Sequence, residues 1–149
     1  MGIFKFVTDK GKDLLRQRDK VAAQAIKKEI GDLGLSKRVK VEVKGDRVSI
    51  GGQVPDQATR EKIILAAGNV TGISTVDDQM KSAKRARAAT MHTVKSGDTL
   101  SKISRRYYKD AMKYKFIFEA NRPMLKHPDK IYPGQVLRIP PLTKAEQSG

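Results

Sequence analysis

The chain contains no cysteine and no tryptophan, and aromatic residues make up only 5% of its 149 residues. The absence of cysteine excludes disulfide bonds and thiol chemistry, which fits a reducing compartment. No apolar run approaches the roughly 20 residues that a helix needs to cross a bilayer. The apolar stretch in residues 1–9 is too short, and too soon interrupted by charge, for a signal peptide. We therefore expect a cytoplasmic protein.

Residues that commonly serve in catalysis are also scarce. Only His92 and His127 have side chains that titrate near neutral pH, and we expect both at the surface. No phosphate-binding loop, nucleophile elbow or zinc-ligand spacing occurs. Asp77 and Asp78 are neighbours on a predicted strand, so their side chains point to opposite faces and do not form a joint metal site. We expect no enzymatic activity.

Acidic residues are few, because 16 Asp and Glu stand against 31 Lys and Arg, and the formal net charge is +15. The excess is spread evenly, with +8 in residues 1–89 and +7 in residues 90–149. Such a field opposes the capture of a cation, although salt screens it beyond about 8–10 Å. It attracts polyanions, so a nonspecific polyanion binder is one possible function. The basic clusters, such as Arg105-Arg106, belong to no nucleic-acid-binding motif, and we expect no specific nucleic-acid partner.

Residues 91–140 show two strand patterns that bracket two helix patterns. Ser96-Gly97-Asp98 has the composition of a turn, and either Asp98 or Thr99 provides an N-cap for a helix that begins at Leu100. Four residues of that helix share one face at helical spacing: Leu100, Ile103, Ser104 and Tyr107. The other predicted elements are strands over 91–94 and 135–139 and a helix over 111–121. The order is β-α-α-β.

The preceding residues predict a second unit with the order α-β-β-α-β. Gly34 ends the first helix, and Gly45-Asp46 is a hairpin turn signal between two alternating runs. The predicted elements are a helix from Asp19 to Leu33, strands over 39–43 and 48–54, a helix over 57–67 and a strand over 73–80.

These patterns predict an α+β fold with two small domains. The first spans residues 1–81 with its N-terminal segment, and the second spans residues 91–140. Residues 82–90 form a basic linker without an apolar stripe, and residues 141–149 form a disordered tail. Each domain has only about 50–70 residues, so it buries a limited core and is marginally stable alone. We expect a monomer.

The second domain resembles the LysM domain. The resemblance rests on Gly97-Asp98-Thr99-Leu100, on Asn121-Arg122-Pro123 and on the run from Ile131 to Pro140. It implies a groove for N-acetylated glycans, such as peptidoglycan or a chitooligosaccharide. The residues implied are Gly97, Asp98, Thr99, Leu100, Ile131 and Tyr132. The alternative is that these residues only determine the fold, because turn glycines and capping hydroxyls are needed for structure anyway.

The first domain resembles the BON domain. The resemblance rests on the strand Val48-x-Ile50-x-Gly52-x-Val54 and on the later run Val70-x-Gly72-Ile73-x-x-Val76-Asp77-Asp78. As a class, BON domains suggest binding or membrane association rather than catalysis.

A BON domain followed by a LysM domain, without an export signal, resembles the family of small cytoplasmic potassium-binding proteins of bacteria. The likeness extends over residues 1–140 and includes Gly2-x-Phe4-x-Phe6-Val7 at the start. It implies selective K⁺ binding in the first domain, with a conformational response that involves the LysM domain. The implied ligands are the backbone carbonyls of Val7, Lys10, Lys12, Gly68, Val70 and Ile73.

The residues themselves are compatible with this chemistry. K⁺ is large and weakly hydrated, and backbone carbonyls replace its water shell. A helix that ends at Ala67 leaves its last carbonyls without intrahelical partners, at the negative end of the helix dipole. Gly68 and Gly72 allow the following backbone to turn its carbonyls inward. The alternative is that residues 68–72 form an ordinary loop between a helix and a strand.

Overall fold

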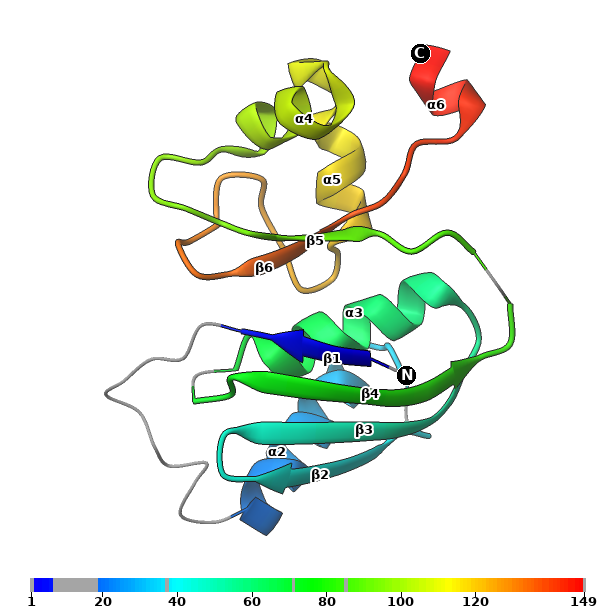
Figure 1. Ribbon diagram of the computed structural model, residues 1–149, viewed down its shortest axis with the longest axis vertical. Helices are drawn as coiled ribbons and strands as arrows, with labels where there is room; N and C mark the ends of the chain where they lie inside the picture. The colour runs from blue at the N-terminus through cyan, green and yellow to red at the C-terminus, as the bar shows by residue number, and fades with distance from the viewer. Residues whose placement is uncertain (1, 7–18, 37, 71, 85, 149) are drawn as a thin grey trace. The chain divides into compact units, whose positions relative to one another are not determined.

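The computed structural model describes residues 2–6, 19–36, 38–70, 72–84 and 86–148. Helices and two separate sheets confirm the predicted α+β class (Figure 1). The chain divides into two compact units, Met1–Ala86 and Arg87–Gly149, and each is described by itself below. Within the described residues, no helix is long and apolar enough to cross a membrane.

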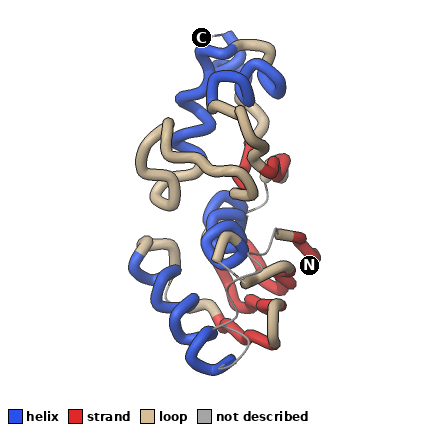
Figure 2. Tube along the Cα trace, turned by 90° about the vertical axis from the view of Figure 1, so that its left-hand side faces the viewer, coloured by secondary structure: helices blue, strands red, loops and turns tan. Residues whose placement is uncertain are grey.

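Unit 1 is a four-stranded sheet with two helices on one face (Figures 1 and 2). Its elements are β1 (Gly2–Lys5), α2 (Asp19–Asp32), β2 (Lys40–Lys44), β3 (Arg47–Val54), α3 (Gln57–Gly68) and β4 (Thr75–Ser82). The strand order is β1-β4-β3-β2. β3 and β4 are parallel because the chain crosses over through α3, whereas β2–β3 and β1–β4 are antiparallel.

Local sequence signals explain where the two helices begin and end. Asp56 is the N-cap of α3, since its Oδ1 accepts the N–H of Thr59 at 2.8 Å. After α2, Gly34 takes a φ of +74°, and the N–H of Leu35 closes the helix end on the carbonyl of Ile30 at 3.1 Å. Gly34 is thus the helix stop that its position in the sequence predicts.

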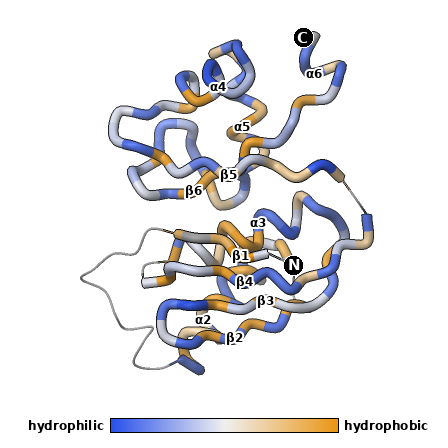
Figure 3. The backbone as a smooth tube through the Cα atoms, viewed as in Figure 1, coloured by the Kyte–Doolittle hydropathy of each residue, from blue (hydrophilic) through white to orange (hydrophobic). Residues whose placement is uncertain are grey.

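The core of unit 1 lies between the helices and one face of the sheet. Its fully buried side chains include Ile26, Ile30, Val48, Ile50, Ile63, Ile64, Ile73, Val76 and Met80, and Figure 3 shows the apolar stretches of these elements. Asp78 is on this inner face, 3% exposed, and is paired with Arg60 at 2.8 Å. Asp77 is on the outer face, 3.6 Å from Arg47. The two acids therefore point to opposite faces, as their adjacency on a strand predicts.

β1 is an additional strand that precedes the predicted order α-β-β-α-β. It pairs antiparallel with β4, with Phe4 opposite Val76. A run of four residues is too short to show a strand period, so sequence analysis did not predict this strand. This strand fixes where the chain enters the region of the candidate site.

Unit 2 has the predicted order β-α-α-β and an extra helix after it. Its elements are β5 (Thr90–Thr93), α4 (Leu100–Tyr108), η1 (Ala111–Lys113), α5 (Tyr114–Ala120), β6 (Val136–Ile139) and α6 (Lys144–Ser148). β5 and β6 pair antiparallel, with His92 opposite Leu137. The predicted helix over 111–121 is divided, because a 3₁₀ turn capped by Asp110 precedes α5. The core contains Val94, Leu100, Ile103, Ile117, Leu125, Leu137 and Ile139.

The end of the chain differs from the expected disordered tail over 141–149. Thr143 and Glu146 form a reciprocal capping box, in which each side chain accepts the backbone N–H of the other residue at 3.2 and 2.9 Å. The buried ammonium of Lys113 donates to the carbonyls of Glu146 and Gln147. These bonds hold α6 against the rest of unit 2.

Candidate functional site

The C-terminal end of α3 is where sequence analysis placed half of the potassium ligands. Asn69, the C-cap, donates its N–H to the carbonyls of Leu65 and Ala67. The N–H of Val70 also goes to the carbonyl of Ala67, at 3.4 Å. Among the described residues, no hydrogen bond reaches the carbonyl of Gly68. A carbonyl without a partner at this end of a 12-residue helix carries the negative end of the helix dipole.

The loop that follows α3 returns on itself before β4 begins. Gly72 has a φ of +95°, a conformation that a residue with a side chain rarely takes. The N–H of Ile73 donates to the carbonyl of Val70 at 3.1 Å, which leaves that oxygen one further lone pair. The carbonyl of Ile73 receives no hydrogen bond from the described residues. Gly68, Val70 and Ile73 thus bring three carbonyl groups into one short loop.

Asp46 and Ser74 hold the far end of this loop. The carbonyl of Asp46 accepts the N–H of Ser74 at 2.8 Å and the N–H of Thr75 at 3.3 Å. The Ser74 hydroxyl donates to the Asp46 carboxylate at 2.6 Å. Sequence analysis identified Asp46 only as a hairpin residue, because a contact across 28 positions leaves no local signal. The clamp joins the β2–β3 hairpin to the candidate site.

Phe6 brings the N-terminal segment to the same place. Its N–H donates to the carbonyl of Ser74 at 2.6 Å, and its ring is buried against Gly68. A Cβ atom on Gly68 would lie 2.0 Å from Cζ of that ring, so any side chain here would displace the ring. Gly68 is helical and is needed for this close approach, which corrects the expectation that it serves to turn the chain.

The other three predicted ligands, Val7, Lys10 and Lys12, lie outside the described residues. Phe6, the last described residue before them, lies beside Gly68 and Ser74.

The proposed ligands are neutral carbonyl oxygens, and the Asp46 carboxylate beside the loop accepts the Ser74 hydroxyl. Residues 68–74 contain no acidic and no basic side chain. Within the described ranges, no three His, Cys, Asp or Glu side chains gather as a metal site. Mg²⁺ and Ca²⁺ bind with the help of carboxylates, whereas backbone carbonyls replace the water shell of K⁺. A monovalent cation is the ligand that this set of atoms suits best.

A shallow groove in unit 2 contains part of the predicted glycan site. It measures about 260 Å³ and is lined by Thr99, Leu100, Ser101, Tyr114, Pro128 and Asp129. Of the predicted residues, Thr99 and Leu100 line it, while Gly97, Asp98, Ile131 and Tyr132 do not. Ile131 packs against the core, and Tyr132 is 48% exposed outside the groove. Ser101 and Tyr114 line it without having been predicted.

Asp98 makes hydrogen bonds within unit 2. Its Oδ2 accepts the N–H of Lys95 at 2.8 Å and lies 3.1 Å from Nε2 of His92. The bond from Lys95, with a smaller contribution from His92, lowers the pKa of the Asp98 carboxyl. His92 is 5% exposed, and its Nδ1 is 2.9 Å from the Tyr107 hydroxyl. The expectation that His92 is a surface residue was therefore wrong, because strand alternation does not reveal which face a later helix covers.

Both domains that the sequence resembles match known families. Residues 18–84 match the BON domain and residues 92–140 match the LysM domain. A relative from Escherichia coli, named potassium binding protein Kbp, is 46% identical over 147 residues, which cover 94% of this chain and 99% of that protein. A protein from Deinococcus radiodurans, named only as uncharacterized, is 40% identical over 108 residues, and the match spans 64% of this chain and 42% of that protein. Neither the relatives' names nor the two domain names specify an enzymatic activity.

Proposed function

Because this chain, a BON domain followed by a LysM domain, belongs to the family of the potassium binding protein Kbp of Escherichia coli, we propose that it binds K⁺ through the backbone carbonyls of its first unit. The ligands proposed are the carbonyls of Val7, Lys10, Lys12, Gly68, Val70 and Ile73. We further propose that the ion binds in the cytoplasm and that binding causes a conformational response that involves the LysM domain.

One observation carries the proposal beyond the likeness to relatives. Phe6, which directly precedes the first three proposed ligands in the sequence, packs on Gly68 and donates its N–H to Ser74, in the loop that contains the other three. The carbonyls of Gly68 and Ile73 receive no hydrogen bond from the described residues, and no charged side chain lies in residues 68–74. Such a set of dipoles holds a large monovalent cation through neutral ligand atoms.

A titration with KCl, NaCl and choline chloride at equal ionic strength tests the proposal. Amide signals of residues 68–74 are expected to shift with K⁺ at concentrations where Na⁺ and choline leave them in place. The amides of Lys28 and Asp32, two exposed residues of α2, serve as a control for general salt effects. Equal shifts with all three salts, or none with K⁺, would rule the site out.

A second candidate function is weak glycan binding by unit 2. The groove favours it, because an aromatic residue, Tyr114, and two polar residues, Thr99 and Asp129, line it together. A single shallow groove buries few contacts, so the affinity is expected to be low. A chitooligosaccharide titration in which a Ser101→Trp variant, which fills the groove, loses binding would support this function. A titration that moves no amide of the groove would remove it.

A further inference from the structure

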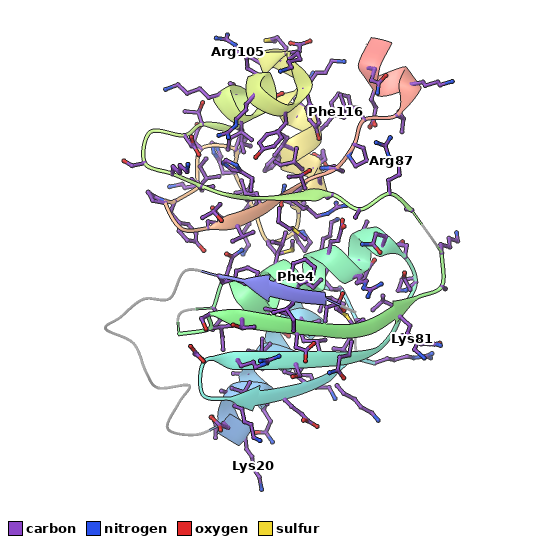
Figure 4. All side chains as sticks on the ribbon, in the orientation of Figure 1. Phe4, Lys20, Lys81, Arg87, Arg105 and Phe116 are labelled. Carbon is purple, nitrogen blue, oxygen red and sulfur yellow. The ribbon has the colours of Figure 1, made fainter. Side chains whose placement is uncertain are left out.

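Helix α4 carries basic residues along its outer side. Lys102, Arg105 and Arg106 are spaced i, i+3 and i+4, which places them on one side of the helix, and Lys109 is the C-cap residue that follows it; all four are exposed. Figure 4 shows Arg105 at the outer surface of α4. We call these four residues the basic stripe. It belongs to neither candidate site described above.

The charge of the basic stripe is not neutralised within unit 2. Helix α4 contains no acidic residue. In the part of the chain that the structure describes, none of the four side chains forms an ion pair. Lys102 donates to the neutral carbonyl of Gly97, and Arg106 lies over the Tyr107 ring and acts on Asp98 only through a weak charge interaction. The stripe therefore presents a positive field to solvent.

The other side of α4 is not available to a lipid bilayer. Leu100 and Ile103 are buried in the core of unit 2. An amphipathic helix that lies on a membrane inserts its apolar face into the interface, and α4 uses that face for its own fold. The exposed side offers charge alone, which favours a hydrophilic polyanion over a membrane.

The density of the charges fits a nucleic-acid backbone. Within α4, Lys102, Arg105 and Arg106 follow one another at rises of about 4.5 and 1.5 Å along the axis, and Lys109 comes directly after the helix as its C-cap. A strand of B-form DNA presents one phosphate per about 3.4 Å of its axis. We propose that the basic stripe binds the phosphate backbone of a nucleic-acid duplex, without reading its sequence. This inference does not depend on K⁺ binding, which concerns unit 1.

The test is fluorescence anisotropy of a labelled mixed-sequence DNA duplex with the full-length chain in a series of NaCl concentrations. Four phosphate contacts predict a slope of log K against log salt near about −3.6. The stripe variant is Lys102→Gln/Arg105→Gln/Lys109→Asn, in which asparagine suits the φ of +64° at position 109. The matched control is Lys115→Gln/Lys126→Gln/Lys130→Gln, which removes the same charge from three exposed positions of unit 2. Arg106 is kept in both because it packs on Tyr107.

The stripe variant is expected to bind at least tenfold more weakly at low salt, with the slope reduced by roughly 2–3, while the control loses less than threefold. Equal losses in the two variants would show that net charge alone attracts DNA and would overturn the proposal. Failure of the unaltered chain to bind would also overturn it, as would tighter binding to anionic phospholipid vesicles than to DNA. If circular dichroism shows that the stripe variant is unfolded, the single exposed change Arg105→Glu replaces it, and an unchanged slope there contradicts the proposal.

Discussion

Gly68 is explained by the ring of Phe6 rather than by an unusual backbone angle. It ends α3 in helical conformation, and its missing side chain leaves room for the Phe6 ring at a distance that a Cβ atom would not allow. The residue therefore keeps the N-terminal segment against the loop of residues 68–73. Any substitution there acts first on packing and only through packing on a bound ion.

Gly68→Ala is expected to destabilise unit 1 by about 1–3 kcal/mol, because the Phe6 ring must move away from the new methyl group. K⁺ affinity is expected to fall in the same variant. Urea denaturation and a KCl titration measure the two effects. Gly31→Ala is the matched control, since Gly31 is also helical but has open space around it, and alanine there is expected to stabilise α2 by up to about 1 kcal/mol. Equal effects at the two positions would contradict the packing explanation.

Asp98 makes the stability of unit 2 depend on pH in the acidic range. The bond from the Lys95 N–H lowers the pKa of its carboxyl in the folded protein, so the ionised form contributes stability above the unfolded value of about 3.9. That contribution disappears as the pH falls through the folded pKa. Asp98→Asn is expected to lose about 1 kcal/mol at neutral pH, the difference between a charged and a neutral acceptor. The variant is also expected to unfold with a flatter dependence on pH below about 4.

Denaturation midpoints across the acidic range measure this effect. Asp129→Asn is the control, because the Asp129 side chain is 90% exposed and lies on the other loop of the glycan groove. If Asp98→Asn has the same pH profile as the unaltered chain and only Asp129→Asn changes it, then Asp98 is not the source of the pH dependence and the prediction is wrong.

At the scale of elements, β1 connects the N-terminal segment to the rest of unit 1. It extends the sheet at β4 and positions Phe6 beside the end of α3. The segment that follows contains three of the six proposed ligands.

Removal of residues 1–12 is expected to abolish K⁺ binding, because half of the proposed carbonyl ligands and the Phe6 anchor go with it. The double variant Lys10→Ala/Lys12→Ala is expected to keep binding, or to improve it by removing positive charge, because main-chain atoms are the ligands. Isothermal titration with KCl compares both with the full chain, and circular dichroism checks that the truncated protein folds. Binding that survives truncation, or that the double alanine variant loses, would place the ligands elsewhere.

The elements differ in how far the sequence reveals them. The stops and caps at Gly34, Asp56 and Thr99 are local, so the helices α2 and α3 and the start of α4 follow from the sequence almost to the residue. The pairing of β1 with β4 and the hold of Lys113 on α6 join distant segments, and no local pattern reveals such partners. The burial of His92 and the clamp between Asp46 and Ser74 also depend on distant segments, so sequence analysis did not predict them. Sequence analysis indicated the loop of the candidate ion site but not the contacts that hold it.

At the scale of the whole molecule, the net charge of +15 disfavours the binding of a cation at the proposed site. Long-range repulsion lowers the affinity for any cation, but added salt screens it beyond about 8–10 Å. The proposed carbonyl shell acts at contact distance, where screening is weak. The two effects therefore respond differently to salt, and this difference separates them by experiment.

The melting temperature of the full chain is expected to rise with choline chloride, because screening reduces the self-repulsion of a basic protein. KCl at equal ionic strength is expected to raise it further, since an ion that binds only the folded state stabilises it by RT ln(1 + [K⁺]/Kd). NaCl is expected to follow choline. The extra effect of K⁺ is expected in the unfolding of unit 1 and to vanish when residues 1–12 are removed, while the effect of screening persists. Scanning calorimetry in the three salts measures both contributions. Identical curves in KCl and choline chloride would show that screening is the whole effect and would exclude a potassium site. That result would not affect the separate proposal that the basic stripe binds DNA.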